Sequence, residues 1–286
     1  MRVPQIASEW KPVLEARKFG NYINDHTIIR DHQGNWHIIG ITSHGGGPSS
    51  ERYFIHGISE NLQGPYMEHS KVVDTGMLAW APCIVEHRGY YYMYYGPSPT
   101  RMAVSPDLHE WFGYEISLQG HPPMACHRDH FVLKVDESEW LMYVTGIKEV
   151  RGSIALLKSS DLLSWTFSGY ALTSGPNLAL TPAWGAFESP YVVKKDSKYY
   201  LFITYTDCSI ENYNRTLVFC SDDPCDFGCY NEGECGAVPV TSIFAHAPEI
   251  ITDEDGTDYI TTCGWNGKGI PFEHCVSMAK LSWEEI

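Results

Sequence analysis

A unit of about 55 residues recurs five times along this chain of 286 residues. Each unit opens with a short tripeptide, continues as an apolar run, passes through a polar turn and returns as a run rich in Tyr, Ile, Val and Phe. Two such runs joined by a polar turn indicate a β-hairpin. Repeats built from short antiparallel strands are typical of β-propeller blades, because one small sheet cannot bury both of its faces without neighbours.

The five hairpin segments align in register. They are NDHTIIRDHQGNWHIIGIT from Asn24, WAPCIVEHRGYYYMYYG from Trp80, RDHFVLKVDESEWLMYVTG from Arg128, FESPYVVKKDSKYYLFITY from Phe187 and HAPEIITDEDGTDYITTCGW from His246. Third runs that resemble one another follow four of them, as RYFIHGISENLQGPY, RMAVSPDLHEWFGY, GSIALLKSSDLLSWTF and TLVFCSDDPCDFG. In these runs an apolar stretch leads to a Ser and a turn, often with Asp-Leu and an aromatic residue.

The repeat predicts an all-β protein, a five-bladed β-propeller formed as a single domain by residues 1–286. The blades are expected to begin near residues 24, 80, 128, 187 and 246, and residues 1–20 to supply the last outer strand of the final blade, which closes the ring. An aromatic content of 13% agrees with this fold, since aromatic residues pack well on pleated surfaces. A β-sandwich, the alternative, predicts no such register between units.

The net charge of −15 restricts the partners of the protein. An acidic surface repels phosphate backbones and anionic lipids, so nucleic acid, membrane and strongly anionic substrates are disfavoured, and neutral small molecules or glycans are favoured. Residues 1–20 contain no apolar run typical of a signal peptide, and nowhere do 18 apolar residues follow one another. A cytoplasmic location is therefore expected, although a chain trimmed of an export signal would look the same.

Nine cysteines, an odd number spread along the chain, indicate reduced thiols rather than a disulfide scaffold. Four of them lie close together, as Cys220, Cys225, Cys229 and Cys235. Their spacing differs from the close pairs of common zinc sites. Ordinary loop thiols are the favoured interpretation of this group, with a structural metal or a local disulfide as the alternative.

The opening tripeptides are the expected functional site. The first strand of each propeller blade lines the central axis, so residues that open equivalent strands converge. The converging sets are Asn24-Asp25-His26, Trp80-Ala81-Pro82, Arg128-Asp129-His130, Glu188-Ser189-Pro190 and His246-Ala247-Pro248. Three carboxylates beside one Arg cannot all be neutralised by simple pairing, which argues against a purely structural role.

Asp25, Asp129 and Glu188 are the candidate catalytic residues. Glycosidic cleavage needs one carboxylic acid to protonate the leaving oxygen, and one carboxylate to attack or to activate water. Neighbouring carboxylates separate each other's pKa values, which keeps one of them protonated near neutral pH. Three carboxylates from three blades would supply an acid, a base and a third group that tunes them.

These motifs resemble two glycosidase families. WAPCIVEHRGYYYMYYG and FESPYVVKKDSKYYLF are similar to the second and fourth blades of glycoside hydrolase family 43, while NDH, RDH and ESP are similar to motifs of family 32. The resemblance implies that Asp25 is the base or nucleophile, that Asp129 holds sugar hydroxyls and tunes the acid, and that Glu188 is the general acid. It also implies that Arg128 braces Asp129 or touches substrate, and that His246 helps to hold a water or a cation, often calcium, in the channel.

Some positions depart from both families, and others are candidates for substrate contact. His26 and His130 replace the usual Pro after the catalytic Asp, where they would either contact sugar hydroxyls, which we favour, or cap strand ends. Cys83 replaces the acidic residue that normally follows WAP. The remaining candidate substrate-binding residues are Asn24, His44, Trp80, Trp184 and Trp265.

The expected function is hydrolysis of a furanoside or pentoside, such as an arabinofuranoside, xyloside or fructofuranoside, with no required cofactor and with calcium or another cation as an optional occupant of the channel. Inversion is favoured because the second and fourth blades look more like family 43. One alternative is a glycosyltransferring or phosphorolytic enzyme, which would need a basic phosphate pocket. The other alternative is a non-catalytic carbohydrate-binding propeller, which would be expected to lack at least one of the three candidate catalytic carboxylates.

Overall fold

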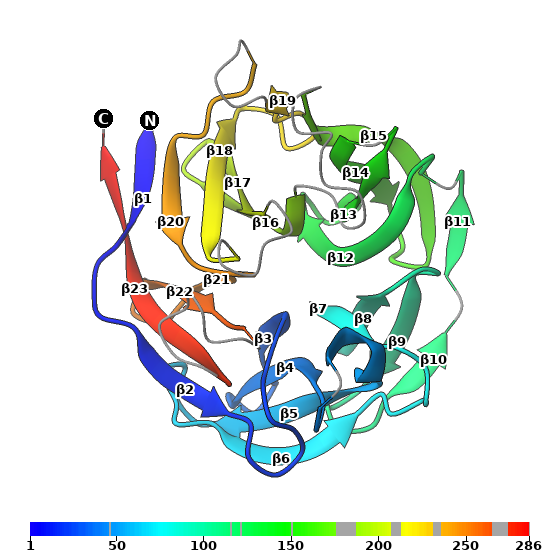
Figure 1. Cartoon of the computed structure of the whole chain (residues 1–286), viewed down its shortest axis with the longest axis vertical. Coiled ribbons are helices and arrows are strands. Elements are labelled where there is room, and N and C mark those ends of the chain that lie inside the picture. Colours follow the sequence, from blue (N-terminus) through cyan, green and yellow to red (C-terminus); the bar gives the residue numbers. More distant parts are fainter. Residues whose placement is uncertain are drawn as a thin grey trace.

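The structure is a computed structural model, and it describes residues 1–45, 47–114, 116–120, 122–149, 151–175, 187–206, 213–230, 236–264 and 274–285. Its strands form five separate sheets arranged around a central axis (Figure 1). The predicted five-bladed β-propeller is confirmed. In the described part of the chain the helical structure is one 3₁₀ turn, η1 (Gly47–Ser50), and no helix there is long and apolar enough to cross a membrane.

The first four blades each run from an innermost strand to the rim in chain order. The first contains β3 (His26–Arg30), β4 (Trp36–Thr42), β5 (Tyr53–Ser59) and β6 (Met67–Val72). The second contains β7 (Trp80–His87), β8 (Tyr90–Gly96), β9 (Arg101–Ser105) and β10 (Phe112–Tyr114). The third contains β12 (Ala125–Lys134), β13 (Trp140–Lys148), β14 (Arg151–Ser159) and β15 (Ser164–Ser174). The fourth contains β16 (Phe187–Lys195), β17 (Lys198–Tyr205), β18 (Arg215–Ser221) and β20 (Thr241–Phe244).

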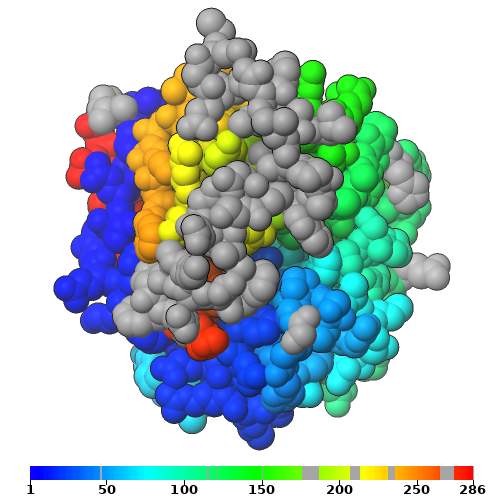
Figure 2. All heavy atoms as spheres, viewed as in Figure 1, coloured from blue at the N-terminus to red at the C-terminus, as the bar shows by residue number. Residues whose placement is uncertain are grey.

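The fifth blade joins the two ends of the chain. Its strands are β21 (Ile250–Thr252), β22 (Asp258–Thr262), β23 (Cys275–Glu285) and, from the N-terminal segment, β1 (Arg2–Ile6). β1 pairs antiparallel with the end of β23, from Arg2 opposite Glu285 to Ile6 opposite Leu281, and β2 (Lys11–Glu15) pairs with the start of β23. Blue N-terminal residues therefore border orange and red C-terminal residues in Figure 2.

Two short strands widen the third sheet. β11 (Ser117–Gln119) and β19 (Cys229–Tyr230) both pair parallel with β15. The second of them carries part of the cysteine group noted in the sequence. Cys220, Cys225 and Cys229 are free thiols, and Cys235 lies outside the described residues.

The Ser-x-Asp-Leu sequences that end two of the third strands form the same turn. In both turns the Ser hydroxyl accepts a hydrogen bond from the Leu N–H, the Asp carboxylate accepts two more backbone N–H groups, and the Trp indole donates to the Leu carbonyl. The residues are Ser105, Asp107, Leu108 and Trp111 in the second blade, and Ser159, Asp161, Leu162 and Trp165 in the third. In these two blades the turn leads from the third strand into the fourth, from β9 to β10 and from β14 to β15.

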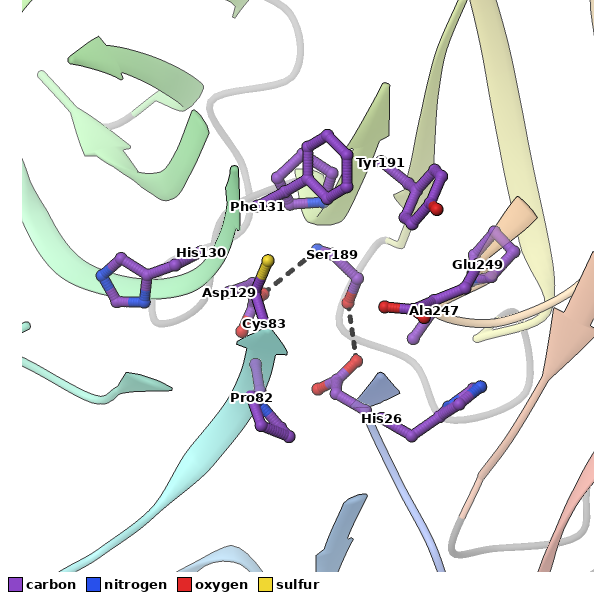
Figure 3. A pocket seen from close by; sticks show the side chains of 14 residues that line it. His26, Pro82, Cys83, Asp129, His130, Phe131, Ser189, Tyr191, Ala247 and Glu249 are labelled. Atoms are coloured by element: carbon purple, nitrogen blue, oxygen red, sulfur yellow. Dashed lines mark hydrogen bonds between the residues drawn. The ribbon is translucent and has the colours of Figure 1, made fainter. Parts of the chain in front are cut away.

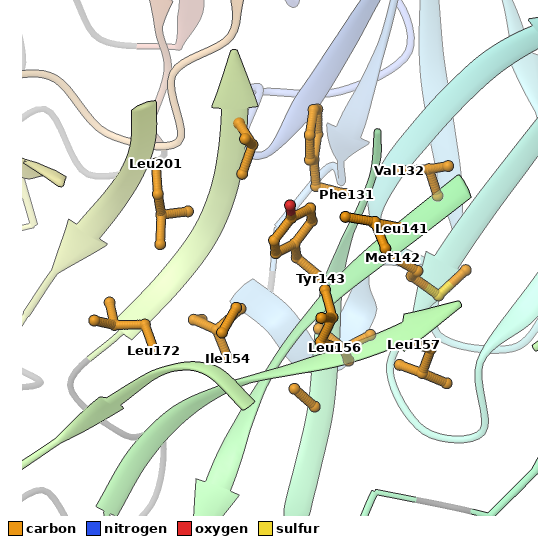
Figure 4. Close-up of a cluster of buried hydrophobic side chains, with 14 of the residues drawn as sticks. Phe131, Val132, Leu141, Met142, Tyr143, Ile154, Leu156, Leu157, Leu172 and Leu201 are labelled. Carbon is orange, nitrogen blue, oxygen red and sulfur yellow. The ribbon is translucent and has the colours of Figure 1, made fainter. Parts of the chain in front are cut away.

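The hydrophobic core lies between neighbouring blades, because each small sheet is covered on both faces. The largest cluster joins the second, third and fourth blades through residues such as Phe131, Leu141, Leu156 and Leu201 (Figure 4). Every residue of β4, for example, is buried. This packing fixes the five innermost strands, and with them the tripeptides that open the blades.

Candidate active site

The second residue of the opening tripeptide has the same unusual backbone in four blades. Its φ is 47° at Ala81, 52° at Asp129, 50° at Ser189 and 44° at Ala247, in the left-handed region. The pairing of β7, β12 and β16 with the next strand also shifts register at this point. A β-bulge of this kind changes the direction of a side chain, so the repeated bulge determines how the tripeptides face the axis.

A small cavity of about 30 Å³ lies on the axis, with room for about one water molecule. All five blades contribute the second and third residues of their tripeptides to its wall, and four of them also contribute the residue that follows (Figure 3). The lining residues are Asp25, His26, Ala81, Pro82, Cys83, Asp129, His130, Phe131, Ser189, Pro190, Tyr191, Ala247, Pro248 and Glu249. The structure therefore brings together residues that the repeat register predicted to converge.

Ser189 joins the two candidate aspartates. Its hydroxyl donates a hydrogen bond of 2.8 Å to Asp25 Oδ1, and its backbone N–H donates one of 3.1 Å to Asp129 Oδ2 (Figure 3). The three residues come from the first, third and fourth blades. A single residue of the fourth blade thus fixes two carboxyl groups from other blades at the axis.

Arg128 joins Asp129 to Glu188. Its Nη2 donates a hydrogen bond of 2.6 Å to Glu188 Oε1, and its Nε lies 3.5 Å from Asp129 Oδ2. The hydroxyl of Tyr213 donates to the other Glu188 oxygen, Oε2. Arg128, Asp129 and Glu188 are each only 5% exposed. One buried cation therefore faces two carboxylates, and the third, Asp25, has the Ser189 hydroxyl instead.

Burial controls the protonation of this group. Removal from water raises the pKa of Asp129 to about 8, against the opposing effect of Arg128, and the neighbouring Asp25 and Glu188 charges raise it further. Burial likewise raises the pKa of Asp25 to about 6, although the hydrogen bond from Ser189 lowers it. Carboxyl groups this close share their protons. Asp129 is therefore the member of the group that holds a proton near neutral pH.

The two histidines that replace the usual Pro occupy equivalent places. His26 Nε2 lies 2.8 Å from the Thr261 hydroxyl, and His130 Nε2 lies 2.8 Å from the Thr100 hydroxyl, in each case on the preceding blade of the ring. Burial lowers the pKa of both rings to about 3, so they are neutral. The Nδ1 atom of each is buried without a hydrogen-bond partner among the described residues. Their contact with substrate stays a prediction.

His246 lies beside the carboxyl group and is 2% exposed. Its Nδ1 is 3.0 Å from the Cys263 carbonyl, and its ring packs edge-on against Tyr213 with centroids 4.5 Å apart. Calcium takes six to eight oxygen ligands, whereas no group of three His, Cys, Asp or Glu ligand atoms gathers around His246 in the part of the chain that the structure describes. These residues alone do not form a calcium site, and the cation stays a prediction.

Three other candidate substrate-binding residues, Asn24, Trp80 and His44, are not part of the cavity lining. Asn24 is buried, with its N–H donating to the Ile41 carbonyl and its Oδ1 unpartnered among the described residues. Trp80 is half-buried at the start of β7, and its indole donates to the Pro48 carbonyl at 3.3 Å. His44 is exposed. Trp184 and Trp265 lie outside the described residues.

Sequence reasoning missed two residues of this site and the role of a third. Ser189 was placed in the converging tripeptides, at the register position of Asp25 and Asp129, but its hydrogen bonds to both were not predicted. Glu249 also had a signal, since it follows HAP as the expected acidic residue follows WAP; burial raises its pKa to about 8, and its Oε2 accepts the Ile28 N–H at 2.7 Å. Tyr213 belongs to no repeated motif, so only the structure could place it beside Glu188.

A second, larger cavity adjoins the small one. It has a volume of about 340 Å³ and shares four lining residues with the first, namely Cys83, Phe131, Tyr191 and Glu249. Burial raises the pKa of the Cys83 thiol to about 12, and its sulfur accepts the Val132 N–H at 3.3 Å. Cys83 is therefore a neutral, packed thiol in the place where an acidic residue was expected.

Known proteins resemble this chain in fold. No protein-family model and no curated protein sequence matches it. A thermostable family-43 glycoside hydrolase superposes with a TM-score of 0.71 at 16% identity, covering 95% of this chain and 94% of that one. A GH43 endo-arabinanase from Bacillus licheniformis gives 0.64 at 17% identity, covering 94% of this chain and 97% of that one.

A longer protein also shares the propeller. A GH32 β-fructofuranosidase from Bombyx mori gives a TM-score of 0.67 at 16% identity. The match covers 96% of this chain but 62% of the fructofuranosidase, so the present chain spans less than two thirds of that protein. The fold is thus the five-bladed propeller found in family 43 and family 32 glycoside hydrolases.

Proposed function

We propose that this protein is a glycoside hydrolase that cleaves a neutral furanoside or pentoside through Glu188 and Asp25. The observation that carries the proposal is the group formed by the half-buried Asp25 and the buried Asp129 and Glu188, linked by Ser189 and Arg128 at the propeller axis. Three neighbouring carboxyl groups, of which one Arg contacts only two, would be a costly way to stabilise a fold. Glycosidic cleavage, by contrast, requires carboxyl groups of differing pKa on either side of the scissile bond.

Glu188 is proposed as the general acid. Its proton passes to the oxygen of the leaving group as the bond from that oxygen to the anomeric carbon breaks. Both of its oxygens accept hydrogen bonds, from Arg128 and Tyr213, which is the arrangement expected once the proton has left. Arg128 then stabilises the carboxylate that remains.

Asp25 is proposed as the general base. It takes a proton from the water that attacks the anomeric carbon on the opposite face, which inverts the configuration. The Ser189 hydroxyl orients its carboxylate. One water is consumed, one proton is taken up by Asp25 and one is released by Glu188, so a proton transfer from Asp25 to Glu188 restores the enzyme. Asp129 stays protonated at neutral pH and can donate a hydrogen bond to a sugar hydroxyl.

The solved neighbours support the substrate class. They include a β-fructofuranosidase variant in complex with sucrose, and a β-xylosidase/α-arabinofuranosidase in complex with xylotriose. Sucrose and xylotriose are neutral sugars, which agrees with the net charge of −15. We therefore propose a neutral glycoside or oligosaccharide as the substrate.

The test compares wild-type protein with Glu188→Gln and Asp25→Asn on aryl arabinofuranoside, xyloside, galactofuranoside and fructosyl substrates. We expect turnover of one class by the wild type, and a loss of about 10²- to 10⁴-fold in kcat for each variant, the usual contribution of a general acid or base. Both variants should keep the circular dichroism spectrum of the wild type and should still bind sugar in calorimetric titrations. NMR identifies which anomer is the initial product and so distinguishes inversion from retention. Full turnover by both variants would refute the assignment.

A further inference from the structure

Four histidines gather where the first blade meets the second, three from the first blade and one from the second. They are His37 on β4, His56 on β5, His69 on β6 and His109 in the turn that follows β9. The centroid of the His56 ring lies 4.9 Å from that of His37, 5.6 Å from that of His69 and 5.4 Å from that of His109. None of the four lies on an innermost strand, so this cluster is separate from the carboxyl group at the axis.

Two of the histidines occupy positions that carry Tyr, Leu, Met or Val in the second, third and fourth blades. Strand register places Tyr92, Leu141 and Tyr200 at the position of His37, and Met102, Leu156 and Val218 at the position of His56. His37 and His56 are nevertheless completely buried. Burying a polar ring in place of an apolar side chain is unfavourable unless its nitrogens are bonded, so the first blade departs from the common core pattern at a cost.

A chain of hydrogen bonds sets the orientation of the buried rings. Asp31 Oδ1 accepts two backbone N–H groups, and Oδ2 lies 3.1 Å from His37 Nε2. A carboxylate can only accept, so His37 donates from Nε2, and its Nδ1 is the acceptor that faces His56 Nε2 at 2.7 Å. His56 therefore donates from Nε2 and keeps a lone pair on Nδ1. Metal-binding histidines are usually fixed in this way through their other nitrogen.

The backbone directs His69 and His109 to the same place. His56 pairs with Ser70 and Gly57 with Glu68, so His69 is the additional residue of a β-bulge. The Ser70 hydroxyl lies 3.3 Å from His56 Nδ1 and 3.2 Å from His69 Nδ1. His109 stands in the Ser-x-Asp-Leu turn, where its N–H donates to Asp107 at 2.9 Å. The same turn in the third blade carries Leu163 at this position, so the histidine is not required to form the turn.

We propose that His56, His69 and His109 bind one divalent transition-metal ion, Zn²⁺ in the first instance, and that it joins the first blade to the second. One ring nitrogen of each residue lies within 4.8 Å of those of the other two. Imidazole nitrogens suit Zn²⁺, Cu²⁺ and Ni²⁺ rather than Ca²⁺ or Mg²⁺. Tetrahedral Zn²⁺ with bonds of about 2.0–2.1 Å holds its ligands about 3.4 Å apart, and His69 and His109 are exposed and can turn inwards. Water takes the fourth position.

Calorimetric titration of the full chain with ZnCl₂ tests this site, after removal of any affinity tag and treatment with EDTA. We expect one ion per chain and a higher Tm with Zn²⁺ than without. His69→Ala and His109→Leu should each weaken binding at least tenfold while leaving the Tm of the metal-free protein nearly unchanged, because both residues are exposed. His109→Leu also reproduces the residue that the third blade carries. His87→Ala, on the second blade and beside Trp140 rather than the cluster, should bind as the wild type does.

Co²⁺ substitution locates the ion independently. A site of three nitrogens gives d–d absorption without the strong near-ultraviolet band of a cobalt–thiolate bond, and this spectrum should vanish in His69→Ala. Binding that is equally tight in His69→Ala and His109→Leu, or a thiolate band that points to the cysteines near Cys225, would overturn the proposal. A wild-type protein that binds no Zn²⁺ would overturn it as well.

Discussion

The Ser189 hydroxyl donates a hydrogen bond of 2.8 Å to Asp25, although the two residues are 164 positions apart in the sequence. The contact crosses from the fourth blade to the first, so it exists only when the ring is complete. It also stabilises the ionised form of a half-buried carboxyl group, and it has a direct consequence for the pH dependence of activity.

Ser189→Ala should move the acid limb of kcat/KM to higher pH. Burial raises the pKa of Asp25 to about 6 even though the hydrogen bond from Ser189 lowers it. A hydrogen bond to a charged group contributes about 1.5–3 kcal/mol, so its loss raises that pKa by about one to two pH units. The measurement is a pH profile on the substrate found by the screen. Ser242→Ala, at an exposed Ser of the same blade, is the control, and an unmoved acid limb in Ser189→Ala would contradict the role of Ser189.

Tyr213→Phe should lower kcat about tenfold or more, with a small effect on KM. The hydroxyl donates to Glu188, so its removal leaves the ionised acid with one stabilising donor fewer after the proton has gone. Steady-state kinetics measure the two parameters separately. The exposed Tyr90 offers a matched Tyr→Phe control. A rise in KM at constant kcat would show instead that Tyr213 binds substrate.

Glu249→Gln should stabilise the protein at alkaline pH. Burial raises the pKa of Glu249 from 4.5 to about 8, so the folded state retains a proton that the unfolded state releases. This contribution to stability is complete below about pH 4.5 and is lost as the pH rises towards 8. Gln cannot ionise and keeps an acceptor for the Ile28 N–H. The difference in Tm between variant and wild type should therefore grow from pH 5 to pH 9, and a constant difference would argue against a neutral Glu249.

Leu141→Ala should cost about 2–5 kcal/mol of the free energy of unfolding, because Leu141 is buried in the cluster that joins three blades (Figure 4). Leu163→Ala removes the same atoms from a side chain that is 42% exposed, and should change stability by less than about 0.5 kcal/mol. Urea unfolding gives both values. Equal costs would mean that the inter-blade cluster does not govern stability.

Much of the fold could be predicted because a propeller repeats its local pattern. The tripeptides, the polar turns and the Ser-x-Asp-Leu sequences recur in register, and each recurrence corresponds to a fixed position in a blade. The same register predicted that Asp25, Asp129, Glu188 and Ser189 converge, although it assigned no role to Ser189. Tyr213 and the His56 cluster could not be predicted in this way, because they depend on residues that break the repeat and on contacts between blades.

Arg2 and Glu285 are neighbours in one sheet, although nearly the whole sequence separates them. Contacts of such high separation form late in folding, because the closure entropy of the intervening loop must be overcome first. A nascent chain cannot complete its fifth blade until its last strand has been synthesised. Linking the present ends and opening the chain between two other blades would convert this late, distant contact into a local one, and should accelerate refolding without altering the axis.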